Sequence, residues 1–269
     1  RPVGRFGLNG VLNATAAYER STVTSENVVA MLPGSDATLR NEYVLLTAHL
    51  DHTGVADAVN GDSIYNGAMD NASGVATLID VARTLRASGT RHRRSVLFLA
   101  CTAEEMGLLG SRFYAERPTV PGRQIVANIN LDMFLPIVPF RQVRAYGLGE
   151  SDLGSHVVAA AGKLGIGVQD DPEPERNLFI RSDQYSFIKK GVPSLFLTIG
   201  YEADSPEAAT MADWFATRYH APSDDVEQPV NLEGAERFNL LMHELTVRIA
   251  NADERPRWMD DSFFAQFAE

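Results

Sequence analysis

The sequence predicts an α/β fold, a three-layer αβα domain built around a central mixed, largely parallel sheet. Five short runs of β-branched and apolar residues, bounded by turn residues, predict buried strands at 27–32, 43–49, 95–102, 125–131 and 194–199. Stretches with helical spacing of apolar residues alternate with them, at 74–87, 107–116, 155–164 and 233–250. Such alternation is typical of a sheet covered by helices on both faces.

Length and composition indicate a single folded unit. The 269 residues, 45% of them apolar, are sufficient for a large core, and we expect one domain over residues 1–269. The net charge of −11 argues against a nucleic-acid partner, which would require clustered Lys and Arg. The longest apolar runs, such as 96–100 and 195–199, are far shorter than the roughly 18 residues that suggest a membrane span. The composition specifies no oligomeric state.

Histidine and acidic residues lie at or just beyond the carboxyl ends of three predicted strands, after the apolar runs 44–47, 96–100 and 125–131. In open α/β sheets, the carboxyl ends of the strands form the ligand-binding crevice. We therefore expect these side chains to meet at one edge of the sheet. The residues are His49 and Asp51, Glu104 and Glu105, and Asp132.

The spacing within these groups suggests roles. The Asp51 carboxylate, two residues beyond His49, could accept the second ring N–H of His49 and fix the tautomer that binds metal. The adjacent carboxylates of Glu104 and Glu105 would repel each other unless a cation or different roles separate them. One could bind a metal while its neighbour transfers a proton. A solvated acidic pair at the positive end of a helix is the alternative.

Three more positions are ambiguous when taken singly. Asp70 lies in a Gly-flanked loop before a predicted helix, where an ordinary helix cap is about as well supported as a ligand. Asp132 is flanked by apolar residues, where an unpaired charge would be costly. His220 alone reads as a surface histidine. Together, these histidines and carboxylates form a donor set without thiolate, which favours catalytic zinc and leaves manganese and cobalt open.

Five motifs in a fixed order carry a resemblance to a known family. They are Ala48-His49-Leu50-Asp51, Met69-Asp70-Asn71-Ala72-Ser73-Gly74, Glu104-Glu105-Met106-Gly107-Leu108-Leu109-Gly110-Ser111, Asn130-Leu131-Asp132-Met133 and Tyr219-His220-x-Pro222-x-Asp224. The chain resembles the co-catalytic di-zinc aminopeptidases, bacterial leucyl-aminopeptidase-like enzymes related to glutamate carboxypeptidases and glutaminyl cyclases. The resemblance covers residues 25–250.

The resemblance implies a zinc-dependent exopeptidase that removes N-terminal residues from peptide substrates with two Zn²⁺ per chain. It implies that Asp70 bridges both ions and that Glu104 is the general base. Tyr219 matches a tyrosine that helps to stabilise the oxyanion in some members, and Asp51 would orient a ligand. The remaining ligands would divide into two pairs, His49 with Asp132 and Glu105 with His220.

Other functions remain open at this point. A glutaminyl-cyclase-like acyltransferase would use one zinc ion, a carboxypeptidase would share the ligands but not the pocket, and a metal-free binding module would have lost its ligands. Asp70-Asn71 and the complete motif at 104–111 favour the hydrolase over the cyclase. The resemblance also suggests a secreted or periplasmic setting, with residues 1–24 as a candidate remnant of an upstream or protease-associated region.

Two segments beyond the motifs carry expectations about the substrate pocket. Residues 200–219 form a long acidic stretch that we interpret as an irregular loop at the pocket rim. Gln184 stands where family members often carry His, so a substrate contact there is in doubt. Candidates for binding the substrate amine are Asp183, Glu202 and Asp204.

Overall fold

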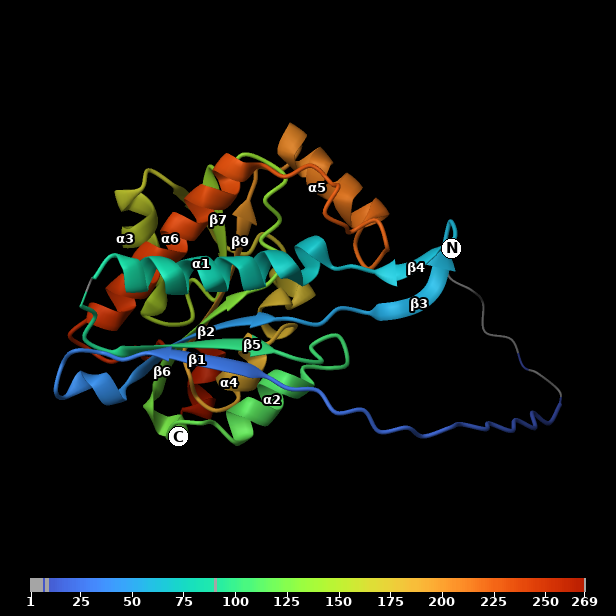
Figure 1. Ribbon diagram of the computed structural model, residues 1–269, viewed down its shortest axis with the longest axis horizontal. Helices are drawn as coiled ribbons and strands as arrows, with labels where there is room; N and C mark the ends of the chain where they lie inside the picture. Colours follow the sequence, from blue (N-terminus) through green and yellow to red (C-terminus); the bar gives the residue numbers. More distant parts are fainter. Residues whose placement is uncertain (1–6, 8–9, 90, 269) are drawn as a thin grey trace.

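The computed structural model describes residues 7, 10–89 and 91–268 and has a mixed sheet at its centre (Figure 1). The sheet has seven strands in the order β1-β5-β2-β6-β9-β7-β8 within this part of the chain. These strands are β1 (Val28–Leu32), β2 (Tyr43–His49), β5 (Ser95–Cys101), β6 (Ile125–Leu131), β7 (Gln142–Tyr146), β8 (Gly167–Gln169) and β9 (Ser194–Gly200).

The middle of the sheet is parallel, as predicted. Strands β5, β2, β6 and β9 pair in parallel, whereas β1 joins β5 and β7 joins β9 in antiparallel fashion. Strand β6 is buried along its whole length, which is the pattern of a strand covered on both faces. The five predicted strands and the mixed, largely parallel sheet are therefore confirmed.

Helices cover both faces of this sheet (Figure 1). On one face lie α1 (Ser73–Ala87), α3 (Leu153–Lys163) and α6 (Leu232–Asn251), and on the other lie α2 (Leu109–Glu116) and α4 (Gln184–Ile188). Alternate residues of β2 serve the two layers: Leu46 packs in the α1–α6 core, and Leu45 packs with Phe187 of α4. The predicted three-layer arrangement is present.

Helix α5 (Pro206–Thr217) corrects one expectation, because it occupies most of the segment that we interpreted as an irregular loop. Ser205 caps this helix by accepting a hydrogen bond from the Ala208 N–H, and Pro206 begins it. Burial of Met211 and Trp214 then fixes one face of the helix against the domain. The acidic composition of this segment led us to predict a loop, although Ser205-Pro206 is a typical helix start and Met211 and Trp214 are apolar residues that pack against the domain.

The remaining elements are short. Strands β3 (Gly54–Val59) and β4 (Asp62–Tyr65) form a separate hairpin, which turns at Asn60 and Gly61. Single turns of helix are η1 (Leu39–Asn41), η2 (Ala68–Ala72), η3 (Gly122–Gln124), η4 (Pro174–Arg176), η5 (Leu178–Ile180) and η6 (Phe263–Phe267). Among the described helices, none has the length and apolar character needed to cross a membrane.

Residues 10–24 are exposed and contain no helix or strand (Figure 1). Contact with the domain begins at Ser25, whose hydroxyl lies 2.6 Å from that of Thr102, and continues at Asn27, which bonds to the Thr102 N–H and the Gly110 carbonyl. The interpretation of residues 1–24 as part of an upstream region stays a prediction.

Candidate metal centre

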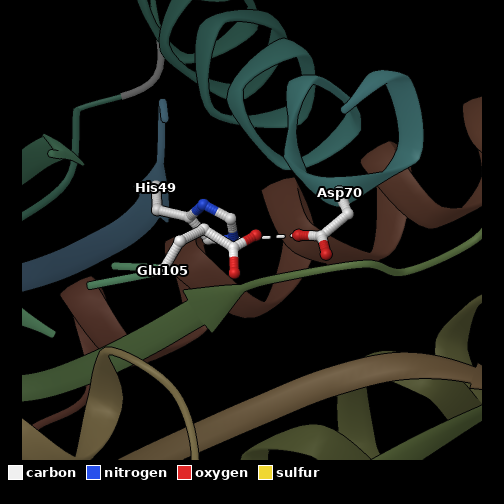
Figure 2. A group of neighbouring side chains, drawn as sticks. All are labelled: His49, Asp70 and Glu105. Atoms are coloured by element: carbon white, nitrogen blue, oxygen red, sulfur yellow. Dashed lines mark ion pairs between the residues drawn. The ribbon is translucent and has the colours of Figure 1, made fainter. Parts of the chain in front are cut away.

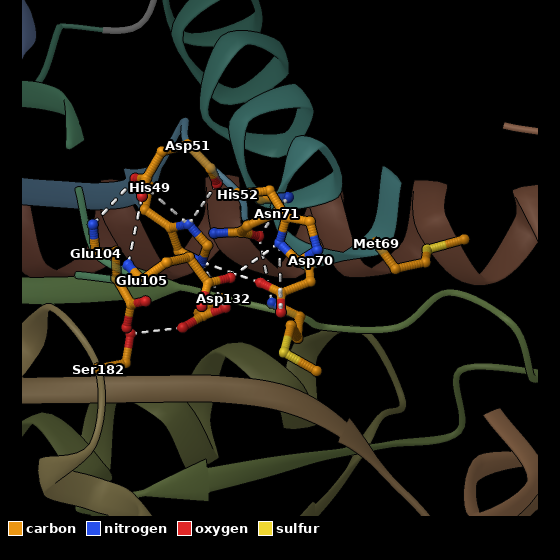
Figure 3. Close-up of polar contacts among 12 residues, drawn as sticks. His49, Asp51, His52, Met69, Asp70, Asn71, Glu104, Glu105, Asp132 and Ser182 are labelled. Atoms are coloured by element: carbon orange, nitrogen blue, oxygen red, sulfur yellow. Dashed lines mark hydrogen bonds and ion pairs between the residues drawn. The ribbon is translucent and has the colours of Figure 1, made fainter. Parts of the chain in front are cut away.

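His49, the last residue of β2, is held in one orientation by its own chain. Its Nδ1 lies 3.0 Å from the backbone carbonyl of Asp51, which can only accept, so Nδ1 carries the proton. The other ring nitrogen, Nε2, points at two carboxylates, with 3.2 Å to Asp70 Oδ1 and 3.2 Å to Asp132 Oδ1 (Figure 3), and would lose its own proton to admit a metal while Nδ1–H stays in place. This is the tautomer required of a metal ligand.

Asp70 stands between two histidines. Its Oδ1 lies 3.2 Å from His49 Nε2, and its Oδ2 lies 3.2 Å from His220 Nε2. Glu105 Oε2 lies 3.4 Å from the same His220 nitrogen. Donor atoms of His49, Asp70 and Glu105 fall within 4.8 Å of one another (Figure 2). The carboxylate of Asp70 thus faces two separate groups of donors.

The electrostatics of this cluster favour positive charge. Burial lowers the pKa of His49, but the carboxylates of Asp132 and Asp70 outweigh it and raise that pKa far above its ordinary value. Burial raises the pKa of Asp70, but hydrogen bonds from His220 and His49 outweigh it and hold the pKa low. The cluster therefore stabilises ionised carboxylates together with a cation among them.

Glu104 differs from its neighbour Glu105. Burial, followed by the charge of Asp132, raises the pKa of Glu104 to about 9. A cation bound among the neighbouring carboxylates would lower this pKa toward neutrality, where a carboxyl group can both take up and release a proton. Glu104 and Glu105 both line the adjoining cavity.

Asp51 supports this pair in a different way from the one we expected. Its carboxylate accepts hydrogen bonds from the backbone N–H groups of Glu104, at 3.1 Å, and Glu105, at 3.3 Å. Its Oδ1 lies 3.9 Å from His49 Nδ1, too far for a hydrogen bond. Because β2 ends at His49, strand alternation no longer applies to Asp51, and its backbone carbonyl orients the ring instead.

A cavity of about 790 Å³ opens beside the cluster. The walls include Glu104, Glu105 and Asp132 on one side and α5 on another, so the segment 200–219 does form part of the rim. Tyr219 lines the cavity, and its ring stacks on His220 with centroids 3.9 Å apart. Burial, then the charge of Asp70, raises the pKa of Tyr219 to about 12, which keeps the phenol able to donate a hydrogen bond.

Sequence reasoning assigned no role to three residues that hold the cluster in place. His52 Nδ1 lies 2.9 Å from Glu105 Oε1, and the His52 side chain is only 5% exposed. Asp224, though within a quoted motif, accepts hydrogen bonds from the Met69 and Asp70 N–H groups. Ser182 donates to Asp132 Oδ2 at 2.5 Å. The histidine directly after Asp51 was the available sequence signal for His52.

The loop that presents Asp70 requires a glycine beside it. Gly67 has a φ of +68°, and a Cβ there would lie 2.3 Å from the Asp70 carbonyl oxygen and 2.7 Å from Cγ of His52. A side chain at this position would displace both the loop and the histidine. The Gly-flanked loop is therefore a constraint on the cluster in addition to its place before α1.

Gln184 and the proposed amine-binding residues lie outside the cavity lining. The Gln184 side chain donates to the Phe179 carbonyl and accepts from Asn130, so it has a packing role. Asp183 is fully buried, and Glu202 and Asp204 are exposed on the chain after β9. None of the three is placed to line the pocket, so this expectation is not supported.

The donor set fits a metal ion. The cluster combines imidazole nitrogens with carboxylate oxygens, a combination that suits zinc at a catalytic site. Cys101 contributes no thiolate, because it is packed with Leu45 and Leu97 in the core between the sheet and α2. Burial raises the pKa of the Cys101 thiol.

This fold and cluster define the class of α/β proteins that gather histidines and carboxylates at the carboxyl edge of a largely parallel sheet. The sequence model of Peptidase family M28 matches residues 27–246. The chain belongs to this family.

Curated relatives cover most of the chain. Leupeptin-inactivating enzyme 1 of Streptomyces exfoliatus is 25% identical over 230 residues, 83% of this chain and 48% of that protein. Leucine aminopeptidase 2 of Trichophyton equinum is 28% identical over 229 residues, 80% of this chain and 42% of that protein. The chain thus spans about half the length of these relatives or less.

Solved structures confirm the fold. The zinc aminopeptidase BSAP of Bacillus subtilis superposes with a TM-score of 0.62 at 24% identity, covering 82% of this chain and 49% of that one. A glutaminyl cyclase of Porphyromonas gingivalis superposes with a TM-score of 0.59 at 20% identity, covering 82% of this chain and 76% of that one. At such identities the likeness concerns the architecture.

Proposed function

We propose that this chain is a zinc-dependent aminopeptidase that binds two Zn²⁺ ions. The observation that carries the proposal is the placement of Asp70, whose two carboxylate oxygens each lie 3.2 Å from a different histidine. A single carboxylate facing two imidazoles is the arrangement expected of a bridging ligand in a two-metal site. Membership of peptidase family M28 supports hydrolysis of peptide bonds.

The remaining donors divide between the two positions. One group consists of His49 and Asp132, whose Nε2 and Oδ1 atoms lie 3.2 Å apart. The other consists of His220 and Glu105, whose Nε2 and Oε2 atoms lie 3.4 Å apart. Each pair shares Asp70, so each ion would have three protein ligands and room for water or substrate, as catalytic zinc sites have.

Bound zinc would polarise the scissile carbonyl and make an attacking water more acidic. Glu104 takes the proton from the attacking water and returns it to the departing amine. The Tyr219 phenol, protonated at neutral pH and lining the same cavity, donates a hydrogen bond to the oxyanion that develops on the substrate. Asp51 keeps Glu104 in place through its backbone N–H.

Metal content and hydrolysis, measured on the same sample, test this proposal. Elemental analysis of protein purified without chelator should give about two zinc per chain, and release of chromophore from aminoacyl anilides should stop on chelation and return with zinc. About one zinc with cyclisation of an N-terminal Gln peptide would instead support the cyclase, whose fold this chain shares. A protein that retains no metal would support a binding module.

A carboxypeptidase is the second candidate within the hydrolases. A probable glutamate carboxypeptidase of Arabidopsis thaliana is 33% identical to this chain over 126 residues, 45% of this chain and 16% of that protein. Cleavage of an N-blocked peptide from its C-terminus would favour this alternative over the aminopeptidase. The secreted or periplasmic setting stays a prediction, which fractionation of the producing cells tests.

A further inference from the structure

Arg144 is a buried cation on the wall of the cavity, and the proposed chemistry does not use it. The residue is 8% exposed, and it lies on β7 with its side chain lining the cavity beside Tyr146. Its Nε donates to Gln169 Oε1 at 3.0 Å, and its guanidinium carbon lies 4.5 Å from the centroid of the Tyr201 ring. These contacts fix the guanidinium in place but supply no negative charge.

No carboxylate in the described part of the chain lies within ion-pair distance of Arg144. Arginine cannot shed its charge, because its pKa exceeds 12. Burial is the largest influence on the neighbouring Tyr146 phenol and raises its pKa, so this phenol stays neutral and does not balance the charge. A charge left unpaired in a mostly buried position is costly, which indicates that the partner arrives with the ligand.

The sheet register places this cation at a useful distance from the metal cluster. Leu131 on β6 lies opposite Leu197 on β9, so Asp132 comes level with Thr198, and Thr198 is the partner of Arg144. Two strand spacings of about 4.8 Å therefore separate the backbones of Asp132 and Arg144, about 10 Å in all. A short substrate side chain and the arginine side chain together can bridge that span.

The other walls suit the stem of such a side chain. Phe196 and Leu178 line the cavity beside Arg144, and Met211 and Phe215 line it from α5. Arg176, also on the wall, is already paired with Glu173 at 2.8 Å, whereas Arg181 is exposed and has no ion pair among the described residues. The cavity therefore offers apolar surface for methylene groups and a cation for an anionic end.

We propose that Arg144 binds a carboxylate of the substrate, and that the preferred substrate is a peptide whose N-terminal residue is glutamate or aspartate. This specificity rests on the proposed aminopeptidase function. The planar guanidinium would hold the carboxylate through its two terminal nitrogens, a geometry that an amide or an aliphatic side chain does not match. An α-carboxylate at the end of a short peptide would present the same chemistry from another source.

Turnover of matched substrates by the zinc-loaded protein tests the preference. We expect kcat/KM for the glutamyl anilide to exceed that for the glutaminyl and leucyl anilides by about 10-fold or more, the factor associated with a hydrogen-bonded charge pair. Arg144→Met should lower the glutamyl-to-leucyl ratio of kcat/KM by about 10–100-fold. The control Arg141→Met, an exposed arginine on the same chain segment that does not line the cavity, should leave this ratio unchanged.

A binding measurement separates this inference from the proposed function. Free glutamate should raise the Tm of the zinc-loaded protein more than free leucine, and Arg144→Met should remove the difference. Because both amino acids carry an α-carboxylate, the difference reports the side chain. Zinc content and Tm of each variant without ligand show that it is folded. Arg144→Lys keeps the positive charge but lacks the planar guanidinium with its two terminal nitrogens, so it should retain part of the preference.

Three results would overturn the inference. One is a wild-type preference for the leucyl anilide, and another is an equal loss on both anilides in Arg144→Met. The third is a preference that follows a free C-terminus, detected by comparing Glu-Ala with its C-terminal amide, which would assign Arg144 to the α-carboxylate. If no anilide is hydrolysed but glutamate still binds through Arg144, the proposed function fails and the carboxylate site remains.

Discussion

Asp224 holds the backbone of Asp70 in position, and removing its carboxylate should destabilise the loop that carries Asp70 into the metal centre. The buried Asp224 side chain accepts hydrogen bonds from the Met69 N–H, at 2.9 Å, and from the Asp70 N–H, at 3.0 Å. A hydrogen bond to a charged group contributes about 1.5–3 kcal/mol. Asp224→Ala should therefore lower the free energy of unfolding by about 3–6 kcal/mol.

Urea denaturation of the metal-free protein, followed by tryptophan fluorescence, measures this loss. Asp224→Asn keeps one acceptor oxygen and should lose about half as much, about 1.5–3 kcal/mol, which preserves the test if the alanine variant does not fold. Asp225→Ala is the matched control, because its carboxylate accepts from the Glu227 N–H at an exposed position. A difference of less than about 1 kcal/mol between Asp224→Ala and this control, with zinc binding intact, would refute the reasoning.

Three further outcomes follow from the site and its surroundings. Glu104→Gln should lower kcat by about 10²–10⁴-fold while zinc is retained, and loss of zinc in this variant would reassign Glu104 as a ligand. His52→Ala should weaken zinc binding by about 10–100-fold in a chelator competition, because it removes the contact to Glu105, and unchanged affinity would exclude that support. Burial raises the pKa of Asp183 to about 6 from 3.8, so its ionisation destabilises the fold as the pH rises from 4 to 6. Relative to its effect at pH 4, Asp183→Asn should add about 3 kcal/mol to the unfolding free energy at pH 8, and Asp204→Asn, at an exposed position, is the matched control.

The sheet was predictable because its strands carry their own signal. Strands β2, β5 and β6 are nearly continuous apolar runs, and such runs arise when both faces of a strand are covered. Strands β7 and β8 escaped prediction for the opposite reason. Strand β7 carries Arg144 among apolar residues, and β8 has only three residues, so neither shows a clear period.

The cluster was predictable to the extent that strand ends determine where side chains meet. His49 ends β2, Glu105 and Asp132 come after β5 and β6, and parallel strands bring their carboxyl ends to one edge. Asp70 comes from the short turn η2 and His220 from the segment after α5, and only the ordered motifs singled them out before the fold was known. Supporting contacts such as that of Asp51 depend on where a strand stops, which residue patterns leave uncertain by one or two positions.

The two histidines of the cluster differ sharply in their access to solvent. The His49 side chain is 1% exposed, whereas that of His220 is 41% exposed. Ligand exchange at a metal requires a donor to swing away and water or a chelator to take its place, and His220 can do so without opening the core. For the proposed two-zinc site, we expect a stopped-flow chelation trace with two phases: a fast departure of one zinc equivalent from the position between Glu105 and His220, then a slow departure of the other. A half-loaded protein would then be a discrete, isolable state, and its residual activity would reveal how much of the chemistry one ion can support.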